Sequence, residues 1–163
     1  LICKAAPPLV NEAQECLGGA GYVEESIVPR LFRQSPLNSI WEGSGNVQCL
    51  DMLRAMAKSP TAVEALHKEL AVAQGAHPAY DRHCHDLQKM LGAVADEPTQ
   101  ARRVAEAVAR ALQAKILLTG ESSWVGEAFC EARLSGNRGM AYGTLDTDLD
   151  FARIIARAGV ALD

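Results

Sequence analysis

Apolar residues recur along most of this chain at the three- and four-residue spacing of α-helices, and almost no segment alternates apolar with polar residues as a β-strand would. The longest helical run extends over residues 96–120. The clearest helical stripe ends at Ser59-Pro60 and consists of Val47, Leu50, Leu53 and Met56. This pattern predicts an all-α protein whose helices form a bundle.

Prolines and glycines divide the rest of the pattern into shorter elements. Pro7-Pro8 start or kink a first helix, which Gly18-Gly19 ends. His77 is expected as the N-cap of a later helix that begins at Pro78, and Gly126 as a break in another helix. Further helices are expected over residues 24–32, 62–73, 122–134 and 148–158, and a turn-rich loop over residues 135–148.

The composition is that of an ordinary globular protein, and its charge narrows the classes of function. Of the 163 residues, 48 % are hydrophobic, and the formal net charge is −4. From Pro98 onward acidic and basic residues balance, so the acidic excess lies in the first half. The chain therefore lacks the basic stripe that is typical of nucleic-acid-binding proteins.

Cysteines and apolar runs bear on the cellular compartment. The five cysteines are irregularly spaced without a C-x-x-C pair, which indicates reduced thiols and a cytoplasmic protein. No apolar run is long enough to span a membrane, and the first ten residues lack the pattern of a signal peptide. Because the chain begins in mid-pattern and without an initiator Met, we expect it to be a fragment of a longer protein.

The segment Leu17–Tyr22, "LGGAGY", is the first candidate for a functional site. Three glycines in four positions allow the backbone to pass very close to another group, and their amides can meet phosphate oxygens. A helix C-cap followed by a turn explains the same residues without a ligand. The sequence pattern alone leaves both interpretations open.

The segment Ser39–Val47, "SIWEGSGNV", places Glu42 between a tryptophan and a flexible turn. A helix begins just beyond it, with Ser44 or Asn46 as the expected N-cap. A carboxylate ahead of a helix is favoured by the helix dipole, so this position does not require a catalytic role. The same position is equally compatible with a carboxylate that acts as a catalytic base.

A histidine-rich segment is a third candidate, for a metal site. On a helix, His77, Asp81 and His85 share one face, as zinc ligands sometimes do, but His83 and Cys84 point elsewhere. A solvated polar face is the simpler interpretation, and no metal is predicted. The sequence also contains no G-x-S-x-G, Walker A or H-E-x-x-H pattern.

Together, the two candidate segments resemble a known family. Residues Glu12–Met56 are similar to the C-terminal helical domain of the acyl-CoA dehydrogenase family, which carries a G-G-x-G-[YF] element, a following Arg, and then [YW]-E-G-[TS] at a fixed distance. The form "NSIWEGSGN" resembles the alkylation-response, AidB-like branch, as do "AFCEARLSG" and "AYGTLD" further on. The resemblance implies part of that helical domain in residues 1–58 and a helical extension packed on it in residues 59–163.

The resemblance also implies a chemistry. Glu42 matches the base that removes the α-proton of an acyl-CoA thioester, while FAD accepts the β-hydride. In the family, the backbone N–H at the Glu position and a flavin hydroxyl polarise the thioester carbonyl, and an apolar wall such as Trp41 raises the pKa of a base by desolvation. Gly18 and Gly19 match a pair that meets the FAD pyrophosphate, usually that of a neighbouring subunit, and Ser44 and Asn46 match further FAD contacts.

Several positions depart from the dehydrogenase pattern. Gln34 stands where the family has the Asp of an Arg-Asp pair that begins at Arg33, and Glu15 stands where it has a flavin-contacting Gln. Trp41 replaces a Tyr, and Cys49 replaces an Arg. These residues look like the AidB-like branch, for which double-stranded DNA binding and little dehydrogenase activity are implied. In such a protein Glu42 is either a carboxylate retained without a catalytic role or an ion-pair partner of Arg54.

The resemblance implies a homo-oligomer, dimer or tetramer, that acts on acyl-CoA. The β-rich domain that holds the other side of FAD is not in these residues. We therefore expect the fragment alone to be a colourless, inactive helical module.

Overall fold

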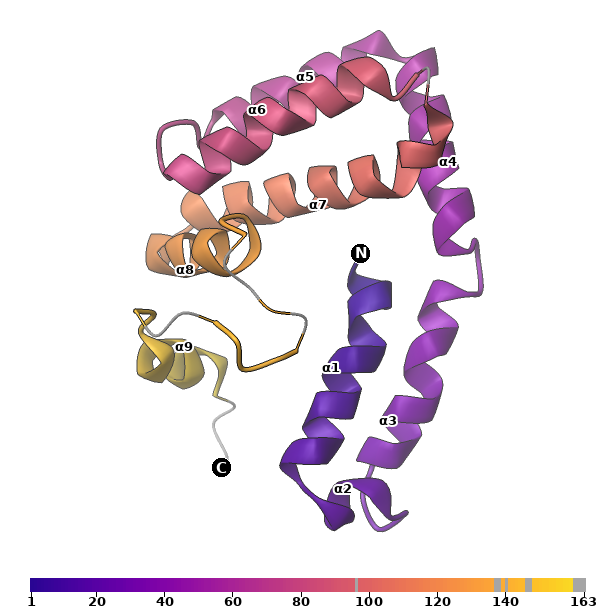
Figure 1. Cartoon of the computed structure of the whole chain (residues 1–163), viewed down its shortest axis with the longest axis vertical. Helices are drawn as coiled ribbons and strands as arrows, with labels where there is room; N and C mark the ends of the chain where they lie inside the picture. Colours follow the sequence, from indigo (N-terminus) through magenta and orange to yellow (C-terminus); the bar gives the residue numbers. More distant parts are fainter. Residues whose placement is uncertain (96, 137–138, 140, 146–147, 160–163) are drawn as a thin grey trace. The chain divides into compact units, whose positions relative to one another are not determined.

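The computed structural model describes residues 1–95, 97–136, 139, 141–145 and 148–159. Within these ranges it contains α-helices and two short 3-10 helices but no β-strand, which confirms the predicted all-α class. In chain order (Figure 1) the elements are α1 (Ile2–Cys16), α2 (Gly19–Tyr22), α3 (Val28–Gln34), η1 (Ser35–Ser39), α4 (Gly45–Lys58), α5 (Pro60–Ala71), α6 (Pro78–Ala93), η2 (Pro98–Gln100), α7 (Ala101–Leu118), α8 (Ser123–Arg133) and α9 (Phe151–Ala158).

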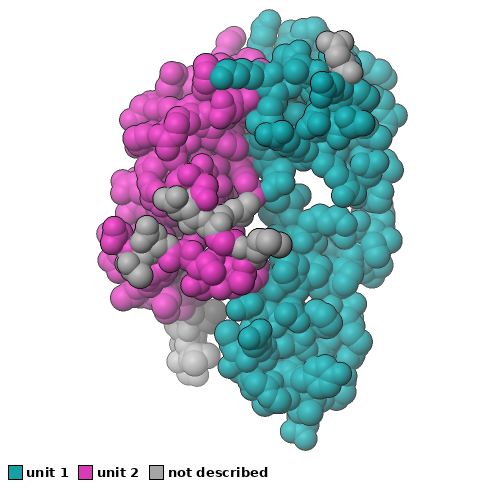
Figure 2. All heavy atoms as spheres, in the orientation of Figure 1, with its two compact units in different colours: residues 1–64, 89–109 teal, residues 65–88, 110–163 magenta. Residues whose placement is uncertain are grey.

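The chain forms two compact units (Figure 2). Unit 1 comprises residues 1–64 and 89–109, and unit 2 comprises residues 65–88 and 110–163. Helices α5, α6 and α7 each contribute residues to both units. Both sequence motifs lie in unit 1, at the two ends of the segment formed by α2, α3 and η1.

Helix α1 does not start at the proline pair, which was one of the two predicted alternatives. It begins at Ile2 and includes Pro7 and Pro8 in its interior. Each proline lacks an N–H, so the helix gives up two backbone hydrogen bonds. Contacts with α2, α3 and η1 hold α1 in place, and Figure 1 shows α1 and α3 side by side. Tertiary packing therefore outweighs the local helix-breaking signal.

Two other expectations needed correction. The helix expected over residues 24–32 begins four residues later, at Val28, with Pro29 in its first turn. The break expected at Gly126 does not occur, because Gly126 lies inside α8 and is buried. A Cβ atom at this position would come within 2.6 Å of the backbone N of Leu118. Gly126 thus permits a close approach between α8 and the end of α7.

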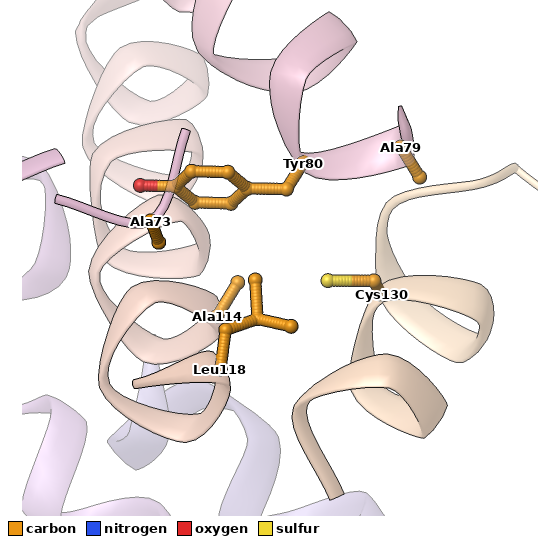
Figure 3. Packing of buried hydrophobic residues seen from close by; sticks show 6 residues of the cluster. All are labelled: Ala73, Ala79, Tyr80, Ala114, Leu118 and Cys130. Carbon is orange, nitrogen blue, oxygen red and sulfur yellow. The ribbon is translucent and has the colours of Figure 1, made fainter. Parts of the chain in front are cut away.

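The core of unit 2 contains a cluster of small and aromatic side chains: Ala73, Ala79, Tyr80, Ala114, Leu118 and Cys130 (Figure 3). The phenol of Tyr80 is buried, and its Oη donates a hydrogen bond of 2.7 Å to the carbonyl of Leu70. This bond satisfies a polar group that would otherwise cost about 1–3 kcal/mol in the core. The Cys130 side chain is fully buried as well.

Burial of Cys130 predicts a loss of stability at high pH. Desolvation raises the pKa of this thiol from its ordinary value of 9.0 to about 12. The unfolded chain therefore ionises first, and the free energy of unfolding should fall by about 1.4 kcal/mol per pH unit above about pH 9 from this group. Below the unfolded pKa the contribution is fully present.

Urea denaturation at several pH values between about 8 and 10.5 measures this slope. In Cys130→Ala the cavity lowers the free energy of unfolding at every pH, so the comparison concerns slopes and not absolute values. The slope of the variant should be shallower than that of the wild type. Burial also raises the pKa of Cys84, so a residual slope of the same sign is expected. Identical slopes in the two proteins would contradict the prediction.

Candidate functional site

Glu42 lies in the turn between η1 and α4, in a backbone conformation that residues with side chains rarely adopt. Its φ angle is 54°, and within the described ranges it is the one non-glycine residue with positive φ. This left-handed conformation costs an L-amino acid roughly 1–2 kcal/mol.

Two neighbours hold this turn in place. The Gln48 side-chain amide donates a hydrogen bond of 3.1 Å to the Glu42 carbonyl. The next residue, Gly43, has a φ of 115°, and a Cβ atom there would come within 2.3 Å of Gln48 Nε2. Gln48 lies one turn into the following helix, a position from which its role could have been inferred from sequence.

The carboxylate of Glu42 is exposed and has no hydrogen bond or ion pair with any described residue. Its backbone N–H is absent from the backbone hydrogen bonds of the turns as well. Trp41 is 57 % exposed, so the described part of this chain does not enclose Glu42 in an apolar pocket. The carboxylate and the N–H of Glu42 are both free to meet another molecule.

Ser44 and Asn46 lie at the start of α4. Ser44 is its N-cap, as one of the two predicted alternatives stated, with φ −60° and ψ 155°. Its carbonyl accepts a 3.0 Å hydrogen bond from the N–H of Gln48, whereas its side chain makes no capping bond. Ser44 and Asn46 are exposed, so their side chains are available at the same turn as Glu42.

The three glycines of the turn before α2 and of α2 itself have different roles. Gly18 has a φ of 59°, which favours glycine in this turn. A Cβ atom at Gly21 would lie 2.4 Å from the carbonyl oxygen of Gln14, so Gly21 permits the packing of α2 against α1. Gly19 has negative φ and open space around it. Gly19 is thus the glycine that packing and turn geometry leave unexplained, as expected for close approach of another molecule.

A pair of alanine substitutions separates these roles. Gly21→Ala forces a side chain against the backbone of α1 and should lower the free energy of unfolding by about 2–3 kcal/mol. Gly19→Ala meets no neighbour within 4 Å and should leave stability within about 0.5 kcal/mol. Chemical denaturation of the two variants measures the difference. Similar destabilisation by both would show that the assignment is wrong.

The two candidate turns lie at opposite ends of α1. The glycine turn follows the C-terminal end of α1 (Figure 1), whereas Gly43 and Gly45 line a cavity with Leu1, Cys3 and Lys4 at its N-terminal end. Fifteen residues of helix separate these ends by about 22 Å. The structure therefore does not bring Gly18 and Gly19 next to Glu42.

Two arginines of this segment have partners that the sequence did not indicate. The guanidinium of Arg33 forms a two-pronged contact with the Glu24 carboxylate, with Nη2 3.1 Å from Oε2. The hydrogen bond from Arg33 holds the pKa of Glu24 below its ordinary value. Arg54 contacts Asp51 at 3.2 Å. The suggested pairing of Glu42 with Arg54 is therefore wrong.

Residues His77 and Asp81 of the histidine-rich segment accept backbone hydrogen bonds, and His77 also contacts a carboxylate. Nδ1 of His77 accepts a 3.1 Å hydrogen bond from the N–H of Ala79, which confirms the predicted N-cap of α6. Its Nε2 lies 3.2 Å from Glu131, and Asp81 accepts a 3.0 Å hydrogen bond from the N–H of Gly75. In the part of the chain that the structure describes, no group of three or more candidate side chains is arranged to hold a metal ion.

The segment that carries both turns identifies the class of protein. Residues 1–57 match the family model of the acyl-CoA dehydrogenase C-terminal domain. These residues therefore belong to the acyl-CoA dehydrogenase family, and their all-α fold agrees with that domain. The match contains Gly18, Gly19 and Glu42 and ends within α4.

Two relatives extend the similarity beyond this domain. The chain is 36 % identical over 148 residues to AidB of Escherichia coli (strain K12), whose name assigns it provisionally to the acyl-CoA dehydrogenases. It is 32 % identical over 118 residues to acyl-CoA dehydrogenase family member 11 of Caenorhabditis elegans. The alignments cover 86 % and 66 % of this chain but 26 % and 19 % of the relatives. The chain thus spans about a quarter of AidB and about a fifth of the nematode protein.

The predictions on membranes and disulfides can be compared with the structure. Across the described residues, no helix is long and apolar enough to cross a membrane. All five cysteines are free thiols: Cys3, Cys16, Cys49, Cys84 and Cys130.

Proposed function

We propose that this chain is the C-terminal portion of an FAD-dependent acyl-CoA dehydrogenase-like flavoprotein in which Glu42 is the catalytic base. The conformation of Glu42 carries the proposal. Backbone strain in a non-glycine residue persists only where the surrounding structure enforces it, and such residues cluster at functional sites. Here Gln48 and Gly43 enforce it, within the segment that belongs to the family. A carboxylate favoured merely by the helix dipole would not need this conformation.

The two free groups of Glu42 suit the two tasks of α,β-dehydrogenation. The carboxylate removes the proton from the α-carbon of the acyl thioester. The N–H, which makes no backbone bond in the described turns, donates to the thioester carbonyl and stabilises the negative charge that develops there. When bound, FAD supplies the acceptor for the β-hydride. As the two hydrogens leave, the α,β carbon–carbon double bond forms.

The described residues fit the binding of FAD in two places. At the Glu42 turn, Ser44 and Asn46 offer exposed polar side chains at the start of α4, and Trp41 offers an exposed aromatic face. At the other end of α1, the open backbone at Gly19 admits a close contact. Because these two places lie at opposite ends of α1, we expect them to contact two different FAD molecules. Gly18 and Gly19 would contact the FAD of a neighbouring subunit.

Exposed apolar side chains in unit 1 support a larger assembly. No residue of α1 is buried in this chain, and Tyr22 is 80 % exposed. Large apolar residues exposed along the same segment include Leu9, Leu17, Ile27, Ile40, Trp41 and Val47. Exposed apolar surface of this extent marks an interface. We propose a cytoplasmic homo-oligomer, dimer or tetramer, whose residues 59–163 form a helical extension.

Double-stranded DNA binding is the less favoured alternative. Affinity for DNA depends on basic side chains that contact phosphates. In the described parts of the chain, Arg33, Arg54 and Lys115 contact carboxylates, and the Arg153 guanidinium lies 4.1 Å from the centre of the Trp124 ring. These side chains would have to leave their partners to bind phosphate. A duplex titration at two salt concentrations distinguishes this function by salt-sensitive binding.

Acyl-CoA-dependent bleaching of the flavin tests the proposed function. The protein used is the longer parent that contains these residues, reconstituted with FAD, because the chain covers about a quarter of AidB. A saturated acyl-CoA added without oxygen should reduce the flavin and yield the α,β-enoyl-CoA in equal amount. The isolated chain should be colourless and inactive. A parent protein that binds FAD but is not bleached by acyl-CoA of short, medium or long chain would contradict the proposal.

A further inference from the structure

Unit 1 contains a cavity of about 380 Å³ on the N-terminal side of α1, separate from the exposed side chain of Glu42. Its lining combines residues of α1, of the turn before α4, of α4 itself and of the first turns of α7. Gly43 and Gly45 line it, whereas Glu42, Ser44 and Asn46 do not. Apart from Gln48, which bonds to the Glu42 turn, the proposed function uses none of its side chains, so the cavity needs a separate explanation.

Two basic side chains in this lining, Lys4 and Arg102, are left without partners. Neither forms a hydrogen bond or ion pair with a described residue. Asn38, which also lines the cavity, likewise has no such bond for its side-chain amide. Arginine offers a planar fork and lysine a point charge, and both are typical of phosphate recognition. The lining therefore includes three exposed side chains that can donate hydrogen bonds to an oxyanion.

The position of Lys4 beside the start of α4 adds to the positive charge around the cavity. A Cβ atom at Gly45 would lie 3.2 Å from Lys4 Cε, so the lysine side chain lies against the first residue of α4. That end of the helix carries positive partial charge, its first turn contains no acidic residue, and the Ser44 side chain does not cap it. The carboxylate of Glu106 in the lining offsets one of the two cationic charges. Counted with Lys4 and Arg102, the lining side chains carry a formal charge of +1 (+2 − 1).

The remaining lining and the volume indicate more than a bare ion. Leu1, Met52 and Ala105 provide apolar surface, and about 380 Å³ lies in the size range of small-molecule sites. We infer that unit 1 binds a small organic phosphate in this cavity, with the phosphate at Lys4, Arg102 and Asn38 and the organic body against the apolar lining. This inference goes beyond the proposed function and does not depend on it.

Direct binding to the full 163-residue chain without flavin tests the site. The probes are hexyl phosphate and adenosine 5′-monophosphate, with inorganic phosphate and adenosine as matched controls. At least one organic phosphate should bind saturably, about tenfold or more tightly than either control. In NMR titrations the amide signals of Gly43, Gly45 and Cys49 should shift, and that of Gly92 should not. Equal affinity for inorganic phosphate, or no saturable binding of either organic phosphate, would overturn the inference.

Matched substitutions locate the phosphate. Arg102→Gln and Lys4→Gln should each weaken binding about tenfold or more. Arg103→Gln is the control, because Arg103 is exposed in the same turn of α7 but does not line this cavity. Its affinity should stay within about twofold of the wild type, and the chain with an acetylated N-terminus should still bind. An equal loss in Arg103→Gln would show non-specific attraction and reject the site. Acyl-CoA bleaching in the parent is measured separately, so either proposal can fail alone.

Discussion

Glu42→Gln in the flavin-loaded parent protein is expected to slow acyl-CoA-dependent flavin bleaching by about 10³-fold, because a positioned general base contributes roughly 10²–10⁴-fold to the rate. The amide has nearly the shape of the carboxylate but cannot accept the α-proton. The backbone N–H of residue 42 is retained, so the carbonyl contact and the affinity for acyl-CoA should change little. Stopped-flow absorbance of the flavin measures the rate, and a titration with a non-reactive acyl-CoA analogue measures the affinity.

Glu25→Gln is the matched control for this prediction. Glu25 is exposed in the same unit, and no described residue forms an ion pair or hydrogen bond with it. The control should bleach at the wild-type rate with the same FAD content. If Glu42→Gln also bleached at that rate, Glu42 would not be the base. Loss of FAD from Glu42→Gln would instead indicate that the residue acts in cofactor binding, which also contradicts the proposed role.

Gly126→Ala is expected to cause a large loss of stability for a substitution that adds a single methyl group. The new Cβ atom would come within 2.6 Å of the Leu118 N and 2.7 Å of its Cα. Both are backbone atoms, so the contact cannot be relieved by rotation of a side chain. The helices must move apart next to the core around Cys130, and the free energy of unfolding should fall by about 3 kcal/mol. Thermal and urea denaturation measure the loss.

Gly92→Ala is a control that should change the free energy of unfolding in the opposite direction. Gly92 also lies inside a helix, α6, but apart from its chain neighbours and the backbone of its own helix no atom lies within 4 Å of the position of its Cβ. Alanine favours helix over glycine by about 1 kcal/mol, so this variant should be slightly more stable than the wild type. The pair thus separates helix propensity from packing. Equal stabilisation of both variants would show that α7 and α8 do not approach each other closely at Gly126.

The helical elements were largely predictable because local patterns specify them. The apolar stripe from Val47 to Met56 reappears as α4, and the Pro78 start of α6 is capped by His77. Gly126 shows the limit of such prediction. A glycine within a helical pattern is compatible with a break and with close packing, and the choice depends on whether another backbone lies beside it. Here Leu118 does, and the helix continues.

The sequence by itself determined the helical class, the family of residues 1–57 and the presence of a carboxylate at a helix start. These properties depend on residue type and spacing along the chain. The tertiary structure alone decided that Glu42 is held with positive φ and that Gly18 and Gly19 lie one helix length away from it. It also brought Lys4 and Arg102 to one cavity. Backbone angles enforced by Gln48, and charges gathered from α1 and α7, arise from contacts between distant residues, which no local pattern encodes.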